Sequence, residues 1–281
     1  MFPDGFVFRR SKRLTLRVDP GVLEITRANI GRASLHRLEW DTEFFGPTFG
    51  MIDAVSVSPK VEDRCEASRM LLDELSLAAE QVGFSHLTYR PSTDDWDAIH
   101  GAERAGFLLI DLGVDFILRP DQGGGVSIDP ALRPSRNEDL PALRNLAGKM
   151  FVHSRFGVDP FFRRSEVERF HEQWVTNLHN GLAQAMFVSE HQSEVTGFVS
   201  CSLQGPQGRI PLIGVSNTHR RAGTGSALVR TAVAWLTTAG ASEIRVKTQA
   251  TNVPAVRLYE SNGFVLDRPE VTYSKALRGR P

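Results

Sequence analysis

A glycine turn near the carboxyl end of the chain has the residue types and spacing to bind an anion. This glycine turn, residues 220–228 (RRAGTGSAL), follows the apolar run 210–215 (IPLIGV) and leads into a stretch with helical periodicity, 226–238. The first N–H groups of a helix lack internal partners and lie at the positive end of the helix dipole, so such a unit binds phosphate. Gly223 and Gly225 have no β-carbon, which allows close approach and a positive φ. We therefore expect a phosphate-bearing cofactor.

Two familiar phosphate-binding motifs do not fit the glycine turn. A dinucleotide-binding fingerprint needs a third glycine where Leu228 stands, and a Walker loop needs a lysine that is missing here. A GxG turn is also typical of an ordinary helix start. The cofactor must therefore be inferred from the surrounding elements.

The composition indicates a globular protein with no net charge. The chain has 281 residues, 41% of them hydrophobic, which is enough for two domains. Its 33 basic and 33 acidic residues balance, so we expect no nucleic-acid or membrane partner. No apolar run is long enough to span a membrane and the opening MFPDGF is no secretory signal, which predicts a cytoplasmic protein. Cys65 and Cys201 lack any metal-ligand spacing, so we expect neither a disulfide nor a metal site.

The chain divides into two halves with a common pattern. The segment 119–125 (RPDQGGG) is typical of an exposed connection. On each side of it lie a helical stretch, a glycine, a strand-like stretch, a second helical stretch and a Gly-Phe pair, related by an offset of 157 residues, as from Gly83 to Gly240. Chance resemblance of two helix–strand–helix units is the alternative. We expect an N-terminal extension (1–30), a first domain (31–120), a linker (121–126) and a second domain (127–281).

The two halves differ at the glycine turn. At the offset positions of Arg220, Gly223 and Gly225 the first half has Asp63, Glu66 and Ser68. These replacements remove a positive charge and two glycines and add two negative charges. We therefore expect the first half to be a degenerate scaffold and the second half alone to bind the cofactor.

The second half resembles the GCN5-related N-acetyltransferases (GNAT), which use acetyl-CoA. The resemblance lies in 132–143 (LRPSRNEDLPAL), 184–199, the strand 210–215, the RxxGxG pattern of the glycine turn and 252–264 (NVPAVRLYESNGF). It implies an α/β (α+β) GNAT fold, with a mixed central sheet flanked by helices, preceded by the degenerate GNAT-like domain. The implied acetyl-CoA contacts are Leu212, Ile213, Gly214, Val215, Arg220, Arg221, Ala222, Gly223, Thr224, Gly225, Ser226, Asn252 and Ala255.

Each part of this implied site has a physical role. The pyrophosphate would accept from amides of residues 221–226, and the pantetheine arm would lie along the edge of strand 212–215. An amide around Ile213 or Gly214 would stabilise negative charge on the thioester oxygen. Asn252 would either hydrogen-bond the arm or cap the helix that follows it.

A narrower resemblance links the chain to bacterial TDP-fucosamine acetyltransferases, which N-acetylate a nucleotide-linked 4-amino-4,6-dideoxy sugar. It lies in 40–46 (WDTEFFG), 153–159 (HSRFGVD) and 174–177 (WVTN). The substrate-binding residues that it implies are His153, Arg155, Asp159, Trp174 and Asn177.

The chemistry of acyl transfer assigns roles to some of these residues. Tyr259 stands where the family has a proton donor for the leaving thiolate, with a packed helix-face aromatic as the alternative. His153 is a candidate general base, and proton loss through ordered water is the other route. Arg155 suits a phosphate and Asp159 suits sugar hydroxyls or the ammonium, unless the two form a surface pair.

The segment before WVTN has a helix-start signal of its own. Ser165 and Glu168 have the spacing of a capping box, which predicts a helix that begins at Ser165 and carries Trp174 and Asn177. Trp174 would stack on a base or sugar of the acceptor, or fill a core.

Two further functions remain open. A GNAT acting on a peptide or small-molecule amine would have an acidic acceptor groove in place of one lined by Arg155. A non-catalytic acyl-CoA sensor would bind the cofactor without turnover. A homodimer is compatible with each of these functions.

Overall fold

The structure, a computed structural model, describes residues 6–11, 14–19, 21–120, 129–150 and 154–278. Its contacts divide it into two compact units. Unit 1 consists of Met1–Leu112 with Glu270–Pro281, and unit 2 of Gly113–Pro269.

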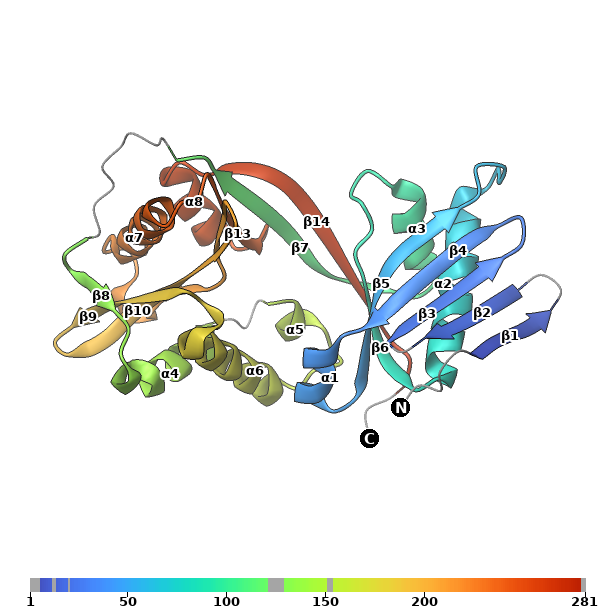
Figure 1. The fold of residues 1–281 in the computed structure, drawn as a ribbon, viewed down its shortest axis with the longest axis horizontal. Coiled ribbons are helices and arrows are strands. Elements are labelled where there is room, and N and C mark those ends of the chain that lie inside the picture. Colours follow the sequence, from blue (N-terminus) through green and yellow to red (C-terminus); the bar gives the residue numbers. More distant parts are fainter. Residues whose placement is uncertain (1–5, 12–13, 20, 121–128, 151–153, 279–281) are drawn as a thin grey trace. The chain divides into compact units, whose positions relative to one another are not determined.

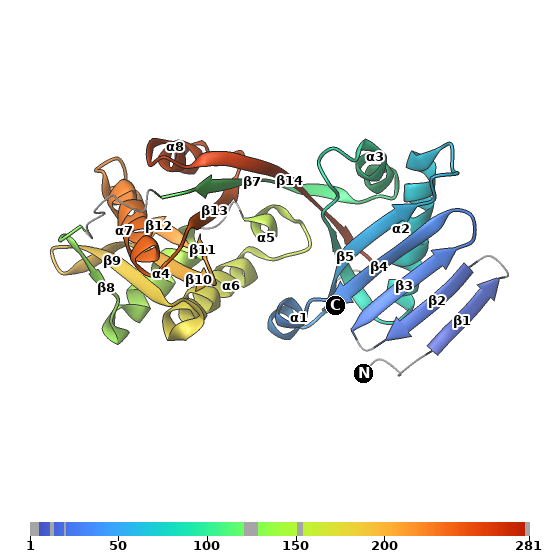
Figure 2. The same cartoon turned by 45° about the horizontal axis from the view of Figure 1, so that its top comes forward.

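Unit 1 is a twisted sheet covered on one face by two helices. The strand order is β1-β2-β3-β4-β5-β6, followed by the last residues of β14 (Val265–Ala276). Alternating apolar residues of β2 to β5 pack against α2 and α3 to form the core, which includes Leu23, Leu35 and Leu71. The elements are β1 (Phe6–Ser11), β2 (Leu14–Asp19), β3 (Val22–Arg27), β4 (Gly31–Arg37), α1 (Glu39–Phe45), β5 (Thr48–Val57), α2 (Arg64–Gln81), β6 (Phe84–Tyr89) and α3 (Trp96–Arg104). Figure 2 shows α2 and α3 on the same side of these strands.

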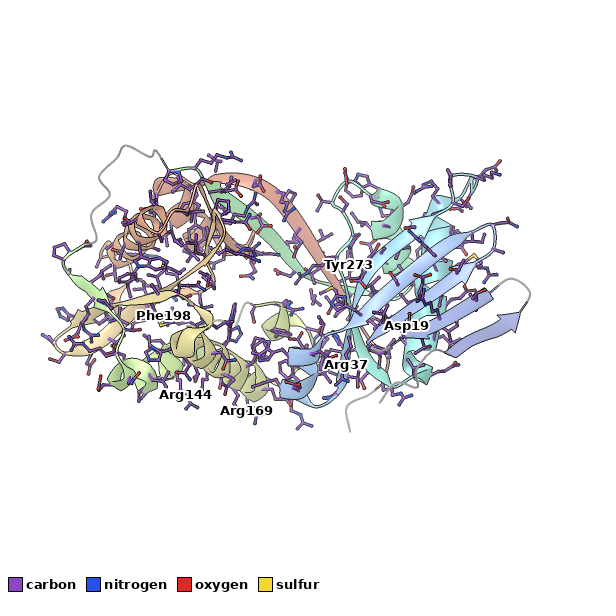
Figure 3. All side chains as sticks on the ribbon, in the orientation of Figure 1. Asp19, Arg37, Arg144, Arg169, Phe198 and Tyr273 are labelled. Carbon is purple, nitrogen blue, oxygen red and sulfur yellow. The ribbon has the colours of Figure 1, made fainter. Side chains whose placement is uncertain are left out.

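Unit 2 has helices on both faces of its sheet. The strand order is β7-β13-β11-β10-β9-β8, beginning with β7 (Leu108–Leu118), and β12 pairs with β10 away from this path. In Figure 1, α7 and α8 lie on one face while α4 and α6 lie on the other. Phe198 of β10, labelled in Figure 3, is fully buried with α4 and α6 residues. The elements are β8 (Leu132–Pro134), α4 (Leu140–Met150), α5 (Arg155–Val158), α6 (Arg164–Asn177), β9 (Ala185–His191), β10 (Glu194–Gln204), β11 (Gln207–Ile210), β12 (Ile213–Val215), α7 (Thr224–Thr238), β13 (Glu243–Gln249) and α8 (Val253–Ser261).

The closing strands of the two halves are exchanged. β7 (Leu108–Leu118) begins in unit 1, but its residues 113–118 pair with β13 of unit 2. β14 (Val265–Ala276) begins in unit 2, but its residues 273–276 pair with β6 of unit 1. The units therefore divide inside these strands, whereas the sequence suggested a division at 121–126, which lies outside the described residues. Residues 14–27 form β2 and β3 of the unit 1 sheet and are no separate extension.

The internal repeat is present in the structure. An offset of 157 residues carries α3 (Trp96–Arg104) onto α8 (Val253–Ser261) without any shift in bounds. Gly83 and Gly240 both end their helices with φ of 100°, and Gly106 and Gly263 have φ of 78° and 85°. Because left-handed backbone at a helix end favours glycine, the glycines at equivalent positions indicate that helices in the two halves end with the same backbone geometry. The predicted helix–strand–helix units are confirmed in both halves.

Candidate active site

The glycine turn forms a helix N-terminus without a side-chain cap. After β12 the chain makes a 3-10 turn over Asn217–His219 and then enters α7 at Thr224. The N-cap residue is Gly223, whose φ is 83° and which has no side chain to accept from the first-turn N–H groups. The first turn also contains no acidic residue. The N–H groups of residues 224–226 are therefore left for a ligand, as an anion site requires.

Arg221 in the same turn has a left-handed backbone, with φ of 63°. A side chain in this conformation costs about 1–2 kcal/mol relative to glycine. The neighbouring Arg220 holds the turn against β12, because its Nε donates to the carbonyl oxygen of Val215 at 3.3 Å. Backbone strain of this kind is typical of ligand-binding loops.

The two glycines of the turn are needed for different reasons. A Cβ on Gly223 would meet no atom within 4 Å, so only the positive φ favours glycine there. A Cβ on Gly225 would lie 3.3 Å from Cδ2 of Leu258, a residue of α8. Gly225 therefore has a packing role against α8, and the predicted phosphate contact at this residue stays a prediction. In unit 1 the larger residue of the pair lies in the first helix. Ser68, at the offset position of Gly225, packs against Gly101, at the offset position of Leu258.

The equivalent helix end in unit 1 is closed. Asp63 is the N-cap of α2, and its carboxylate accepts from the N–H of Glu66 at 2.9 Å. Glu66 adds a second carboxylate, paired with Arg69 at 2.5 Å. A phosphate would meet two negative charges and a blocked amide at this end.

β11 and β13 part from each other beside the glycine turn. Their parallel pairing ends at Ile210 and Val246, and Pro211 follows, which has no N–H to continue the ladder. β12 then pairs with β10 alone, so within the described chain its other edge has no strand partner. Ser200 of β10 helps to hold the start of β12 against β10, because its Oγ accepts from the N–H of Leu212 at 3.0 Å. An extended ligand can add to this edge as a further strand.

The register of β12 determines which amides reach its open edge. The N–H of Ser200 donates to Leu212 and the N–H of Ser216 donates to Thr196, so even-numbered residues bond to β10. In an antiparallel ladder the bonding direction alternates, so the N–H of Gly214 points to β10 and that of Ile213 points to the open edge. Of the two amides named from the sequence, Ile213 is the one available to a ligand.

Tyr259 of α8 is buried, with 3% of its surface exposed. Its ring packs against Phe116 and Phe264, with centroids 5.8 and 5.9 Å away. Burial raises the pKa of its phenol above the ordinary value near 10. The group therefore stays protonated at neutral pH and is able to donate a proton.

Asn252 is the N-cap of α8. Its side-chain oxygen accepts from the N–H of Ala255 at 3.4 Å and its Nδ2 donates to Thr248 Oγ1 at 3.2 Å. Pro254 lies in the first turn, where its missing N–H costs nothing. Of the two roles predicted for Asn252, the helix cap is the one observed in the structure.

Residues 143–264 match the family model described as Acetyltransferase (GNAT) family. The chain carries a GNAT acetyltransferase domain. The matched range runs from α4 to Phe264, so it contains the glycine turn, β12 and Tyr259. The predicted enzyme class, an N-acetyltransferase, is confirmed.

Curated relatives cover different shares of the chain. The dTDP-fucosamine acetyltransferase of Escherichia coli is 29% identical over 237 residues, 83% of this chain and 93% of the relative. The spore coat polysaccharide biosynthesis protein SpsD of Bacillus subtilis is 27% identical over 142 residues, 50% of this chain and 49% of the relative. N-alpha-acetyltransferase 30 of Homo sapiens is 31% identical over 96 residues, 32% of this chain and 26% of the relative.

Solved structures share the fold over nearly the whole chain. A GCN5-related N-acetyltransferase from Sphaerobacter thermophilus has a TM-score of 0.62 at 14% identity, over 96% of this chain and 82% of that one. A tandem GNAT protein from the clavulanic acid biosynthesis pathway has a TM-score of 0.55 at 13% identity, over 92% of this chain and 84% of that one. The predicted GNAT fold class is thereby confirmed.

The predicted acceptor residues begin in and after α5 of the GNAT domain. His153 lies outside the described residues. The Arg155 guanidinium lies 4.2 Å from the ring centroid of Phe156. Asp159 is buried, and its Oδ1 accepts from the N–H of Phe161 at 2.9 Å, so this carboxylate shapes the turn after α5.

α6 of the GNAT domain carries the remaining predicted acceptor residues. Trp174 is half-buried and lies 6.4 Å from Phe170 between ring centroids, as the core-packing alternative expects. Asn177 ends the helix and accepts from Gln173 at 2.8 Å. The predicted capping box at Ser165 and Glu168 is wrong. The N-cap lies two residues before Ser165, at Arg163, whose N–H donates to the Glu166 carboxylate at 2.9 Å.

Two polar residues that shape the GNAT site were not predicted from the sequence. One is Ser200, which supports β12. The other is Asn262, whose Nδ2 donates to Ser226 Oγ in the first turn of α7 at 3.1 Å. Asn262 directly precedes a glycine at the end of α8, a pattern that indicated only a helix end.

The described residues contain no cluster of His, Cys, Asp and Glu suited to a metal ion. Among the helices of the described chain, none has the length and apolarity needed to cross a membrane.

Proposed function

We propose that the protein transfers the acetyl group of acetyl-CoA to the amino group of a nucleotide-linked, TDP-type 4-amino-4,6-dideoxy sugar. The observation that carries the choice of acceptor is the similarity to a dTDP-fucosamine acetyltransferase over 83% of this chain and 93% of the relative. The similarity to an N-alpha-acetyltransferase is confined to 96 residues. Similarity that includes both units favours the sugar acceptor over a peptide.

The described residues fit acetyl-CoA as the acyl donor. The open N-terminus of α7 suits the pyrophosphate, with Arg220 and Arg221 as nearby positive charges. The free edge of β12 suits the pantetheine arm, whose amides would bond to Ile213 and Val215. Ile213 and Val215 pack against the hydrophobic cluster that contains Tyr259, so we propose that the thioester end of the arm lies near this phenol.

The reaction follows from these positions. The neutral amine attacks the thioester carbon, and the N–H of Ile213 stabilises the negative charge that develops on the oxygen. When the C–S bond breaks, the Tyr259 phenol protonates the leaving thiolate. The proton lost by the amine passes to solvent, either through ordered water or through His153, and the Tyr259 phenolate regains a proton from solvent.

The acceptor would bind at α5 and α6. Arg155 would pair with a phosphate of the nucleotide, while Trp174 and Asn177 would contact the base or the sugar. Asp159 already accepts a backbone hydrogen bond, so its role would be to hold the α5 turn in place. Unit 1 would serve as a scaffold without its own cofactor, and an enzyme that uses these two metabolites would work in the cytoplasm.

A thiol-release assay tests the proposal. The purified protein is incubated with acetyl-CoA and a panel of TDP-linked 4-amino sugars, and free coenzyme A and the acetylated sugar are followed together. Peptides with free N-termini and polyamines form the matched panel for the alternative. We expect turnover on at least one sugar and none on the peptides. The reverse pattern would reject the sugar acceptor, and coenzyme A binding without turnover on any amine would favour the sensor.

A further inference from the structure

A side-chain hydrogen bond ties the first turn of α7 to the end of α8. Asn262 Nδ2 donates to Ser226 Oγ at 3.1 Å. The same nitrogen donates to the carbonyl oxygen of Leu258 at 2.7 Å, which anchors the amide at the end of its own helix. The position of the donor at Ser226 is therefore fixed by α8.

This bond leaves the proton of Ser226 available. A serine hydroxyl has one proton to donate and two lone pairs, and Asn262 uses a lone pair. Other hydroxyls inside helices of this protein donate back to the preceding turn, as Thr237 does to Val233 at 2.8 Å and Ser76 does to Leu72 at 2.7 Å. Among the described residues, none accepts from the Ser226 hydroxyl. The hydroxyl therefore adds a donor to the N–H groups at the open helix end.

The pair is present in only one of the two halves. The offset positions of Ser226 and Asn262 are Arg69 and Ala105 in unit 1. There Arg69 pairs with Glu66 and Asp73, and the helix end is closed by Asp63. The serine–asparagine pair thus occurs where the helix end is open and is missing where it is closed.

We propose that Asn262 is a positioning residue for the acyl donor. By donating to Ser226 Oγ, it turns the serine hydroxyl proton toward a phosphate oxygen bound at the N-terminus of α7. Asn262 itself does not touch the ligand. The inference rests on the proposed binding of acetyl-CoA at this turn and adds a residue outside the glycine turn to that site.

A double-mutant cycle tests the inference. We compare the full-length protein with Ser226→Ala, Asn262→Ala and the double variant, and measure the Kd of coenzyme A by calorimetry. We expect each single change to weaken binding by roughly ten- to 100-fold, the size of one hydrogen bond to a charged group. Because Asn262 acts through Ser226, we expect the double variant to bind no more weakly than Ser226→Ala. Thr237→Ala is the matched control, since its Oγ1 donates to Val233 at the other end of α7 and makes no contact with Asn262.

Kinetics with a shortened donor separate this role from helix packing. S-acetylpantetheine lacks the pyrophosphate, so we expect its KM to stay unchanged in Asn262→Ala while the KM for acetyl-CoA rises and kcat is retained. Asn262→Asp keeps the size of the side chain but accepts from the Ser226 hydroxyl, so it should bind coenzyme A more weakly than Asn262→Ala. This variant also tests the idea if Asn262→Ala folds poorly.

Three results would overturn the inference. They are additive losses in the double variant, an equal KM rise with S-acetylpantetheine, and coenzyme A binding by Asn262→Asp that matches the wild type. A wild-type protein that fails to bind coenzyme A would overturn the proposed function as well, so the two failures are distinguishable.

Discussion

Replacement of Tyr259 by phenylalanine separates the catalytic role of its hydroxyl from the packing role of its ring. None of the described residues hydrogen-bonds this hydroxyl. The contacts of the ring with Phe116 and Phe264 are kept in Tyr259→Phe. We therefore expect the free energy of unfolding to change by less than about 0.5 kcal/mol and acetyl-CoA affinity to be unchanged.

The loss in rate is set by the two groups that exchange the proton. General acids contribute about 10²–10⁴-fold. Tyr259 is a weak acid because burial raises its pKa. A thiol with a pKa near ~8.5 is a good leaving group, so its thiolate leaves without full protonation. Both points place the contribution of Tyr259 to the rate at the lower end of this range. We expect kcat to fall about 100-fold, which corresponds to roughly 2.7 kcal/mol of transition-state stabilisation.

The assay is a single-turnover acetyl transfer at saturating acetyl-CoA, so that product release does not mask the chemical step. Tyr89→Phe is the matched control, because Tyr89 is also buried and its phenol pKa is also raised, but it lies in β6 of unit 1. Since the raised pKa keeps Tyr259 protonated, the wild-type rate should show no decline as pH approaches 10. A Tyr259→Phe rate within threefold of the wild type would refute the assignment.

Three further changes test the reasoning elsewhere in the fold. Arg221→Gly removes a side chain from left-handed backbone, so it should raise stability by about 1 kcal/mol and Tm by roughly 2–4 °C in thermal melts. Burial lowers the pKa of His171 to about 4, so the stability that its neutral ring contributes is present above pH 6.5 and is lost as pH falls toward 4. In His171→Gln, denaturant titrations across this range should show an acid-induced loss of unfolding free energy that is smaller by up to about 3 kcal/mol. Gly101→Ala would place a Cβ 2.6 Å from Ser68 Cβ and 3.0 Å from the backbone nitrogen of Arg69, so it should cost about 1–3 kcal/mol of unfolding free energy. Gly225→Ala would place a Cβ 3.3 Å from the flexible Leu258 side chain and 4.0 Å from Val215, so it should cost under about 1 kcal/mol.

Residues that start or end helices made much of the second half predictable from the sequence. The glycine turn and the Asn-Val-Pro helix start each determine backbone geometry within a few residues. The repeat was recoverable for the same reason, because Gly83 and Gly240 end their helices in the same conformation. Short-range signals of this kind survive when overall identity between the halves is low.

Features that depend on distant pairing were not predictable. Nothing within β7 or β14 indicates that each would pair in the opposite half, because both strands have the same alternating pattern whichever neighbour they join. The partner of Gly225 is Leu258, 33 residues farther along the chain, so its small size looked like a property of the turn alone. The start of α6 was missed because Glu166 accepts from the backbone of an arginine, a residue type that gives no cap signal.

Comparison of the two helix pairs shows which difference controls phosphate binding. At the α2–α3 contact the small residue is Gly101 in unit 1, and at the α7–α8 contact it is Gly225 in unit 2. Both arrangements allow the two helices to pack. In unit 1 the glycine missing at position 68 is compensated by Gly101, so its loss does not by itself remove a phosphate site. What is not compensated is the charge, because Asp63 fills the helix end that Gly223 leaves open in unit 2. The electrostatics of the helix end, more than its backbone shape, therefore separates the half proposed to bind the acyl donor from the half proposed to support it.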